Sequence, residues 1–112
     1  MTAPRFDRGY ELWDPKPLFP GEQVFLLAGG PSLTREVADR VRDRRRIAIN
    51  SSHLVAPDAD ILFFTDNSWF EPRREIVAAW PGMVITLSIA AKRTLPDKII
   101  RFSVEWMDHF PE

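Results

Sequence analysis

A run of five apolar residues, Val24 to Ala28, passes directly into the turn "GGPS" and then into a helical pattern. A short continuous apolar run is typical of a strand that is covered on both faces of a parallel sheet. From Leu33 to Val41, apolar residues recur three and four positions apart, which is the spacing of one helical face. A strand followed at once by a helix predicts a βα unit, from which α/β domains are built.

Four more apolar or β-branched segments follow, each bounded by turn residues. They span Arg46 to Asn50, Ile61 to Thr65, Met83 to Leu87 and Lys98 to Ser103. About ten residues separate the second and third strands, so we expect a single short helical turn between them. A further helix is predicted over Pro72 to Ala79, with its proline in the first turn. This order predicts an α/β, three-layer Rossmann-like domain with a mostly parallel sheet of about five strands.

The first 22 residues differ from the rest of the chain, because they contain four prolines and show no hydrophobic periodicity. Residues 1–22 are therefore predicted to form an N-terminal arm that lies across the domain. Residues 23–112 are predicted to form a single Rossmann-like α/β domain, which fits a chain of 112 residues. The last strand is expected to be reached through a loop that closes at "TLPD".

Composition excludes several classes of site and partner. The chain has no cysteine, which excludes disulfides, thiolate metal sites and thiol catalysis. Its net charge of −1 gives no overall field toward nucleic acid or an anionic membrane, and neither is expected as a partner. No apolar stretch has the length of a signal peptide core or a membrane span, so we expect a soluble cytoplasmic protein.

The two histidines, His53 and His109, show no ligand spacing to each other or to a carboxylate cluster, so no metal site is predicted. The interpretation we favour for His53 is a surface loop residue, and the alternative is a general base at the edge of the sheet. The segment "DAD" before the third strand is interpreted as turn chemistry rather than as a metal motif.

Polar residues collect directly after the first three strands, where ligands bind in open parallel sheets. Paired glycines let the backbone approach a ligand, and Pro31 could begin a helix whose free N–H groups hold an anion beside the Ser32 hydroxyl. The alternative to an anion site is a tight strand-to-helix turn in which Ser32 only caps the helix. The alternative to ligand binding by Asn50 is that its side chain bridges two loops. The predicted ligand-binding residues are Gly29, Gly30, Pro31, Ser32, Asn50, Ser51 and Asp66. Trp69 either supplies a stacking wall beside them or closes the sheet edge.

Known catalytic and nucleotide signatures are absent. Neither G-x-G-x-x-G nor G-x-x-x-x-G-K-[ST] occurs, so a standard dinucleotide fold and a P-loop are not indicated, and the catalytic residues are unknown. A second candidate surface is the segment "RVRDRRR". Its arginines either complete a solvated helix end or contact an acidic partner surface or a nucleic-acid backbone. The predicted partner surface consists of Arg40, Arg42, Arg44, Arg45 and Trp106.

The stretches "LLAGGPSL" and "IAINSSHLVAPDADILFFTDNSWF" resemble a family of Rossmann-like proteins common in phages and prophages. That family has a strand, G-x-G-P-S-L, a helix, a strand ending in Asn, and a strand ending in D-x-x-W-W. The opening motif is also similar to that of bacterial sialyltransferases (glycosyltransferase family 42), which bind a cytidine nucleotide-sugar, and to a family related to archaeal pterin diphosphokinases. The resemblance covers roughly residues 22–87.

Carried over by position, the resemblance places Gly30, Pro31 and Ser32 at a nucleotide phosphate, Asn50 near the ribose or base, and Asp66 on the same edge. Two departures matter. Ala28 and Gly29 stand where the sialyltransferases have Gly and Asn, and Phe70 replaces the second Trp of the phage pattern. The relatives also continue for roughly as long again beyond the matched part, where the sialyltransferases carry their catalytic histidine. The resemblance therefore implies only the nucleotide-side half.

Three functions follow as hypotheses. The first is a small phage-type module that retains an edge for a pyrimidine nucleotide or nucleotide-sugar and has no complete catalytic set. The second is a protein-interaction module, such as a phage-encoded inhibitor of a host defence protein, or a chain that self-associates through its aromatic ends. The third is a glycosyltransferase that needs a second subunit. All three act in the cytoplasm of an infected bacterium, and we expect no turnover by the isolated chain.

Overall fold

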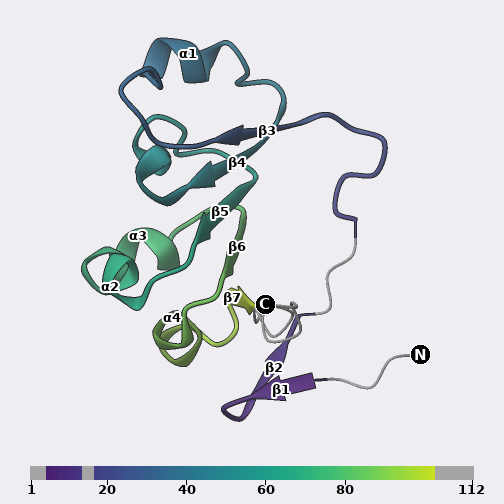
Figure 1. Ribbon diagram of the computed structural model, residues 1–112, viewed down its shortest axis with the longest axis vertical. Coiled ribbons are helices and arrows are strands. Elements are labelled where there is room, and N and C mark those ends of the chain that lie inside the picture. Colours follow the sequence, from purple (N-terminus) through teal and green to yellow (C-terminus); the bar gives the residue numbers. More distant parts are fainter. Residues whose placement is uncertain (1–4, 14–16, 103–112) are drawn as a thin grey trace, which may run out of the picture.

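The computed structural model describes residues 5–13 and 17–102, and Figure 1 shows how the elements are arranged. Five strands form one sheet in which every neighbouring pair is parallel. In spatial order they are β3 (Val24–Leu27), β4 (Arg45–Ile49), β5 (Ile61–Phe64), β6 (Met83–Thr86) and β7 (Ile99–Arg101). The predicted α/β Rossmann-like class and the parallel sheet are confirmed, and each of the five predicted strands is present.

Short helical segments connect the strands, and the first of them after β4 is the single turn that the sequence predicts. The segments are α1 (Arg35–Asp39), η1 (Asn50–Leu54), α2 (Asn67–Phe70), η2 (Glu71–Arg73), α3 (Arg74–Ala78) and α4 (Ile89–Thr94). The α4 helix occupies part of the segment before β7 that the sequence predicts to be a loop. Ser88 begins it, because its hydroxyl accepts a hydrogen bond from the Ala91 N–H at 3.1 Å.

The strands lie side by side in the same order as they follow in the chain. Right-handed crossovers that all advance in one direction place their helices on the same face of a sheet. Figure 1 shows α1, α2, α3 and α4 on one side of the strands. Within residues 5–13 and 17–102 the sheet therefore carries one helical layer. The second layer of a three-layer arrangement is not found there, and neither is a point where the strand order reverses.

The core lies between the sheet and these helices. One side chain from each strand points to the helical side in a single row, because paired residues of neighbouring strands share a face. The row consists of Leu27, Ala48, Leu62, Val84 and Ile99, all of them buried. Phe70, Val77 and Ala91 from the helices belong to the same apolar cluster.

The alternate strand positions point to the other side of the sheet, which we call the open sheet face. Two rows of side chains form it: Leu26, Ile47, Ile61 and Met83, and Ile49, Phe63, Ile85 and Ile100. None of the helices in the described ranges contributes to this face. Ile61 and Ile85 are buried, Leu26 on the edge strand is 64% exposed, and the remaining side chains are half-buried.

A β-hairpin precedes the sheet. Its strands, β1 (Arg5–Asp7) and β2 (Tyr10–Leu12), pair antiparallel around Arg8 and Gly9, whose φ angles are +52° and +82°. Positive φ at both central residues is the pattern of a two-residue type I′ turn. The Trp13 N–H donates to the Arg101 carbonyl at 2.8 Å, and Asp7 pairs with the Arg101 guanidinium at 2.7 Å. The hairpin therefore lies against β7. The sequence predicts only an arm without periodicity for residues 1–22, so this hairpin is a correction to that prediction.

No helix in residues 5–13 and 17–102 combines the length and the apolar character that crossing a membrane requires. Within the same ranges, no group of three or more histidine and acidic residues is arranged so that it could hold a metal ion.

Candidate functional site

The carboxyl ends of β3, β4 and β5 lie next to one another, because these strands are parallel neighbours. The residues after them therefore lie along one edge of the sheet, as the sequence predicts. All seven predicted ligand-binding residues are exposed there: Gly29, Gly30, Pro31, Ser32, Asn50, Ser51 and Asp66. We call this set the carboxyl edge.

The glycine loop forms the first part of the carboxyl edge. Gly30 has a φ of +156°, a value that favours glycine, and its carbonyl accepts a hydrogen bond from the Leu33 N–H at 3.1 Å. A Cβ atom built on Gly29 or Gly30 would meet no atom within 4 Å. The Ser32 hydroxyl forms no hydrogen bond to any residue that the structure describes. Open space and a free hydroxyl thus lie side by side after β3.

The helix after this loop begins later than predicted. Thr34 is the N-cap of α1, and its Oγ1 accepts a hydrogen bond from the Val37 N–H at 3.2 Å. Pro31 therefore does not begin the helix, and Ser32 is not its cap, so both of those predictions are wrong. Pro31 and Ser32 lie in a turn that precedes α1, so the anion site that the sequence predicts would be formed by this turn rather than by the first helical turn, and it stays a prediction.

Asn50 occupies an unusual backbone conformation at the end of β4. Its φ is +52°, in the left-handed region that asparagine tolerates better than most residues. Its carbonyl oxygen lies 3.1 Å from His53 Nδ1, while its side-chain amide forms no hydrogen bond within the described ranges. Asn50 therefore does not bridge two loops there, and its amide is available at the carboxyl edge.

His53 is only 6% exposed, so the prediction of a surface loop histidine is wrong. The 3₁₀ turn of η1 folds its ring inward, beside the Asn50 carbonyl. The ring also meets Trp69 edge-on, with 5.6 Å between the ring centres. His53 thus packs beneath the carboxyl edge rather than facing a ligand on it.

Trp69 closes the sheet edge rather than offering a free stacking surface. The Phe64 ring stacks on it at 4.8 Å, and the Arg73 guanidinium lies over it at 4.7 Å. Its indole N–H donates to Ser51 Oγ at 3.4 Å. A nucleobase that stacked on Trp69 would compete with these two neighbours for the surface of the ring. Of the two interpretations of Trp69, the structural one is therefore favoured.

Asp66 and Asn67 follow β5 but have different surroundings. Asn67 Oδ1 accepts hydrogen bonds from the Ser88 hydroxyl at 2.6 Å and the Ala90 N–H at 3.2 Å, which ties this loop to α4. The Asp66 carboxylate is exposed, and it forms no hydrogen bond or ion pair with the described part of the chain. Asn67 is therefore structural, while Asp66 remains free to bind.

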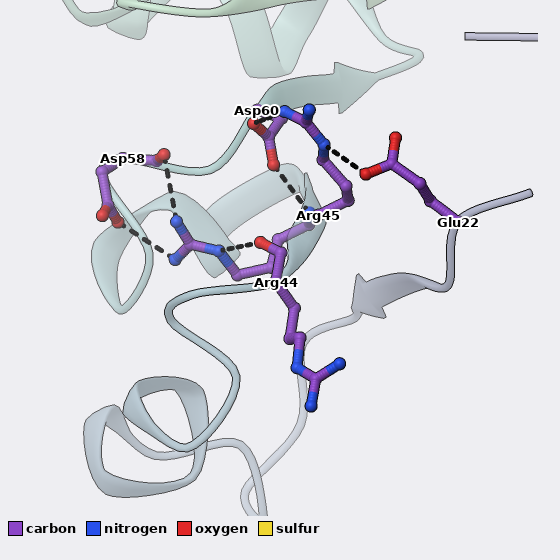
Figure 2. A network of polar contacts seen from close by, with 6 residues as sticks. Glu22, Arg44, Arg45, Asp58 and Asp60 are labelled. Atoms are coloured by element: carbon purple, nitrogen blue, oxygen red, sulfur yellow. Dashed lines mark hydrogen bonds and ion pairs between the residues drawn. The ribbon is translucent and has the colours of Figure 1, made fainter. Parts of the chain in front are cut away.

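The arginine-rich segment lies at the opposite, amino-terminal end of the strands, as a network of ion pairs (Figure 2). Arg46 is 5% exposed, and its guanidinium donates to Asp58 Oδ1 at 3.1 Å, to the Asp58 carbonyl at 3.2 Å and to the Arg44 carbonyl at 3.3 Å. The hydrogen bond from Arg46 lowers the pKa of the Asp58 carboxyl below its ordinary value of 3.8. The "DAD" acids therefore serve as partners of arginines.

The predicted partner surface carries little unbalanced charge. Arg45 pairs with Glu22 at 3.2 Å and with Asp60 at 3.4 Å, on the border of a polar hollow of about 590 Å³. Arg40, Arg42 and Arg44 pair with Glu36, Asp58 and Asp43 at 3.6, 3.8 and 3.9 Å. Because α1 ends at Asp39, Arg40 is its C-cap and lies at the helix end, whereas Arg42 and Arg44 lie in the turn that follows and Arg45 begins β4. Trp106 lies outside the described residues.

Comparison with known proteins identifies no relative: no family model matches the chain, and no curated protein or solved structure matches it. The resemblance to the phage family and to the sialyltransferases therefore stays a prediction.

Proposed function

We propose that the carboxyl edge binds a small ligand that carries a phosphate and sugar hydroxyls, with a pyrimidine nucleotide or nucleotide-sugar as the expected class. One observation carries this proposal. Three neighbouring strands deliver exposed polar side chains, Ser32, Asn50 and Asp66, that have no partner in the described part of the chain. A polar group that serves the fold is normally hydrogen-bonded, as Asn67 is.

Each part of the carboxyl edge suits one part of such a ligand. The open space at Gly29 and Gly30 lets a phosphate approach the backbone, and the Ser32 hydroxyl can donate to a phosphate oxygen. The Asp66 carboxylate can accept hydrogen bonds from sugar hydroxyls. The Asn50 amide can both donate and accept, which suits a sugar or a base edge.

The proposed role is binding, with no reaction assigned to the chain by itself. His53 is buried, and the edge presents no pair of groups in which one could activate the other. We place the protein, as a proposal, among small phage-type modules that act in the cytoplasm of a bacterium. Pairing with a second subunit that supplies catalytic groups remains the third hypothesis.

The interaction module is the alternative function, and one observation favours it: the open sheet face is apolar. The arginine segment supports it less, because each of its guanidinium groups has a carboxylate neighbour. Exposed ion pairs of this kind contribute little to stability, and their mutual neutralisation also weakens attraction to an acidic partner.

Thermal shift with CMP, CDP, UDP and several nucleotide-sugars tests the proposed function. A ligand at 100 times its dissociation constant stabilises the fold by about 2.7 kcal/mol, which raises the melting temperature by roughly 10 °C for a domain of this size. The Asp66→Asn variant should lose most of this shift while keeping the melting temperature of the free protein. Asp97→Asn, which changes another exposed carboxyl in the turn before β7, is the matched control and should keep the shift.

A flat panel at millimolar ligand would contradict the proposal. So would an equal shift in the Asp66→Asn and Asp97→Asn variants, because the ligand would then bind elsewhere. Release of the sugar from a nucleotide-sugar by the isolated chain would contradict the assignment of a binding role alone.

A further inference from the structure

Asn50 adopts a backbone conformation that is unfavourable for residues other than glycine. Its φ of +52° lies in the left-handed region, which asparagine tolerates better than most residues but does not prefer. Conformations of this kind persist only where the surrounding structure holds them, and they are concentrated at binding and active sites. The residues that hold Asn50 are therefore candidates for a role at the carboxyl edge.

The left-handed turn at Asn50 changes where its side chain lies. Side chains alternate between the two faces of a strand, so a continued β4 would place position 50 on the same face as Ala48, which is fully buried. Asn50 is exposed at the carboxyl edge instead. The turn therefore brings to this edge a polar side chain that would otherwise point toward the core.

His53 supplies the contact that holds this turn. Its Nδ1 lies 3.1 Å from the carbonyl oxygen of Asn50. Because a carbonyl oxygen can only accept a hydrogen bond, Nδ1 carries the proton and is the donor, which fixes the tautomer of the neutral ring. The ring is buried, so this hydrogen bond is shielded from competing water.

Trp69 holds the His53 ring in place and connects it to the loop after β5. The two rings meet edge-on at 5.6 Å, and the indole N–H of Trp69 donates to Ser51 Oγ at 3.4 Å. Trp69 belongs to α2, whose N-cap is Asp66. The turn that presents Asn50 is therefore packed against the helix that begins at Asp66.

We propose that His53 is a positioning residue for the ligand of the carboxyl edge, an inference that rests on the function proposed above. Its Nδ1–H holds the Asn50 backbone in the left-handed conformation, and this conformation presents the Asn50 amide to the ligand. The ring itself lies beneath the edge and does not contact the ligand. A group that is held in place before binding loses little conformational freedom when the ligand arrives, which increases the affinity.

Two variants of His53 separate its hydrogen bond from its packing. His53→Phe keeps a flat ring of similar size and removes the donor. His53→Asn keeps an N–H at the place of Nδ1, because both nitrogens are bonded to Cγ, and it removes the rest of the ring. If His53 only fills space, His53→Phe should be the milder change in every measurement. If it positions Asn50, His53→Phe should harm ligand binding more, even though the cavity in His53→Asn should give that variant the lower melting temperature.

Nuclear magnetic resonance of the ligand-free chain measures the backbone of Asn50. An amide proton and the α proton of the same residue lie closer together at positive φ, so the nuclear Overhauser effect between them should be strong at Asn50. It should fall to the level of an ordinary residue in His53→Phe and stay strong in His53→Asn. At alkaline pH, where imidazole is neutral, the nitrogen signals of His53 should show the proton on Nδ1. A strong effect at Asn50 in His53→Phe would overturn the proposal.

Calorimetric titration with CMP measures the consequence for binding. His53→Phe should raise the dissociation constant about tenfold, while His53→Asn should stay within about threefold of the wild-type value. Asn50→Gly removes the amide, so adding His53→Phe to it should cause no further loss of affinity. The same loss on adding His53→Phe with and without the Asn50 amide would overturn the proposal, because His53 would then act by another route.

The two measurements distinguish failure of this inference from failure of the proposed function. If neither CMP nor any other nucleotide of the thermal-shift panel binds the wild-type chain while the Overhauser effects are as expected, the proposed function is wrong and His53 acts on the backbone alone. If CMP binds the wild-type chain and His53→Phe with equal affinity, the site stands and the positioning role of His53 is overturned.

Discussion

Arg46 shows how one pair of side chains lets a charge lie in the interior of this small domain. Its guanidinium is buried at the start of β4 and keeps three hydrogen bonds, two of them to Asp58. Its backbone N–H donates to Asp60 Oδ2 at 2.9 Å, so both acids of "DAD" hold the same residue. Without these partners the desolvated charge would destabilise the fold strongly. The acids are therefore required by the arginine.

The pH dependence of stability tests this arrangement. The pKa of Asp58 is lowered in the folded state, chiefly by its hydrogen bond to Arg46, from an ordinary value of 3.8. Its stabilising contribution is therefore present above about pH 4 and is lost as the pH falls through the lower folded-state value. Asp58→Asn should reduce the free energy of unfolding at pH 7 by about 1 kcal/mol, allowing for the exposure of the carboxylate.

Urea unfolding of the wild-type chain and of Asp58→Asn at several pH values measures this difference. The gap between the two curves should narrow as the pH falls below 4. A gap of the same size at pH 3 and pH 7 would show that the carboxylate charge does not stabilise the fold.

Gly82 marks a close approach of two backbone segments. A Cβ atom at this position would overlap the carbonyl oxygen of Asp60, which also accepts a hydrogen bond from the Met83 N–H at 3.0 Å. Gly82→Ala should therefore destabilise the protein by about 1–3 kcal/mol, since backbone cannot yield as a side chain can. Gly29→Ala, which enters open space without a positive φ, should change stability by less than about 0.5 kcal/mol. Thermal unfolding compares the two, and equal losses would contradict the packing argument.

At the scale of elements, α4 depends on its first residues more than on its length. It has six residues, too few for a stable isolated helix. The Ser88 hydroxyl accepts from the Ala91 N–H and donates to Asn67, so one side chain both begins α4 and ties it to the loop after β5. The buried Ile89 and Ala91 then hold the helix on the sheet.

Ser88→Ala should lower the free energy of unfolding by about 1–2 kcal/mol, because it removes the cap and leaves Asn67 with one partner fewer. Thr34→Ala at the exposed cap of α1 makes the same chemical change without a second hydrogen bond, and should cost about 0.5–1 kcal/mol. Denaturant unfolding of both variants is the measurement. A larger loss at Thr34 than at Ser88 would contradict the dual role of Ser88.

At the scale of the whole molecule, the two faces of the sheet differ in how much stability they carry. The helical side holds the buried apolar cluster, in which Leu62 is fully enclosed. The open sheet face is apolar as well, but its edge residue Leu26 is 64% exposed. The free energy lost on truncating a side chain should therefore depend strongly on which face it occupies.

Leu62→Ala should reduce the free energy of unfolding by about 2–5 kcal/mol, through lost burial and the cavity that it leaves. Leu26→Ala removes the same atoms from a mostly exposed position, and should change stability by less than about 0.5 kcal/mol. Equilibrium unfolding in urea distinguishes the two, and a large loss at Leu26 would mean that another surface covers β3.

The sequence by itself determined the α/β class, the parallel strands and the edge at which polar residues collect. Short apolar runs and turn residues are local signals, and the rule that parallel strands end at one edge then places Gly30, Asn50 and Asp66 together. The type I′ hairpin at Arg8 and Gly9 also has a local signal, which is a glycine in a two-residue turn.

Only the tertiary structure decided which of the polar residues are free. Asn67 and Asp66 are neighbours in sequence, yet Asn67 is bonded to Ser88 while Asp66 is not bonded to any described residue. Burial of His53, and pairing of the arginines with acids up to 23 residues away, likewise depend on long-range contacts. The strand order decided that the described helices share one face. Local sequence patterns do not encode the bonding of Asn67, the burial of His53, the pairing of the arginines or the placement of the helices. Each of these depends on residues that meet only when the chain is folded.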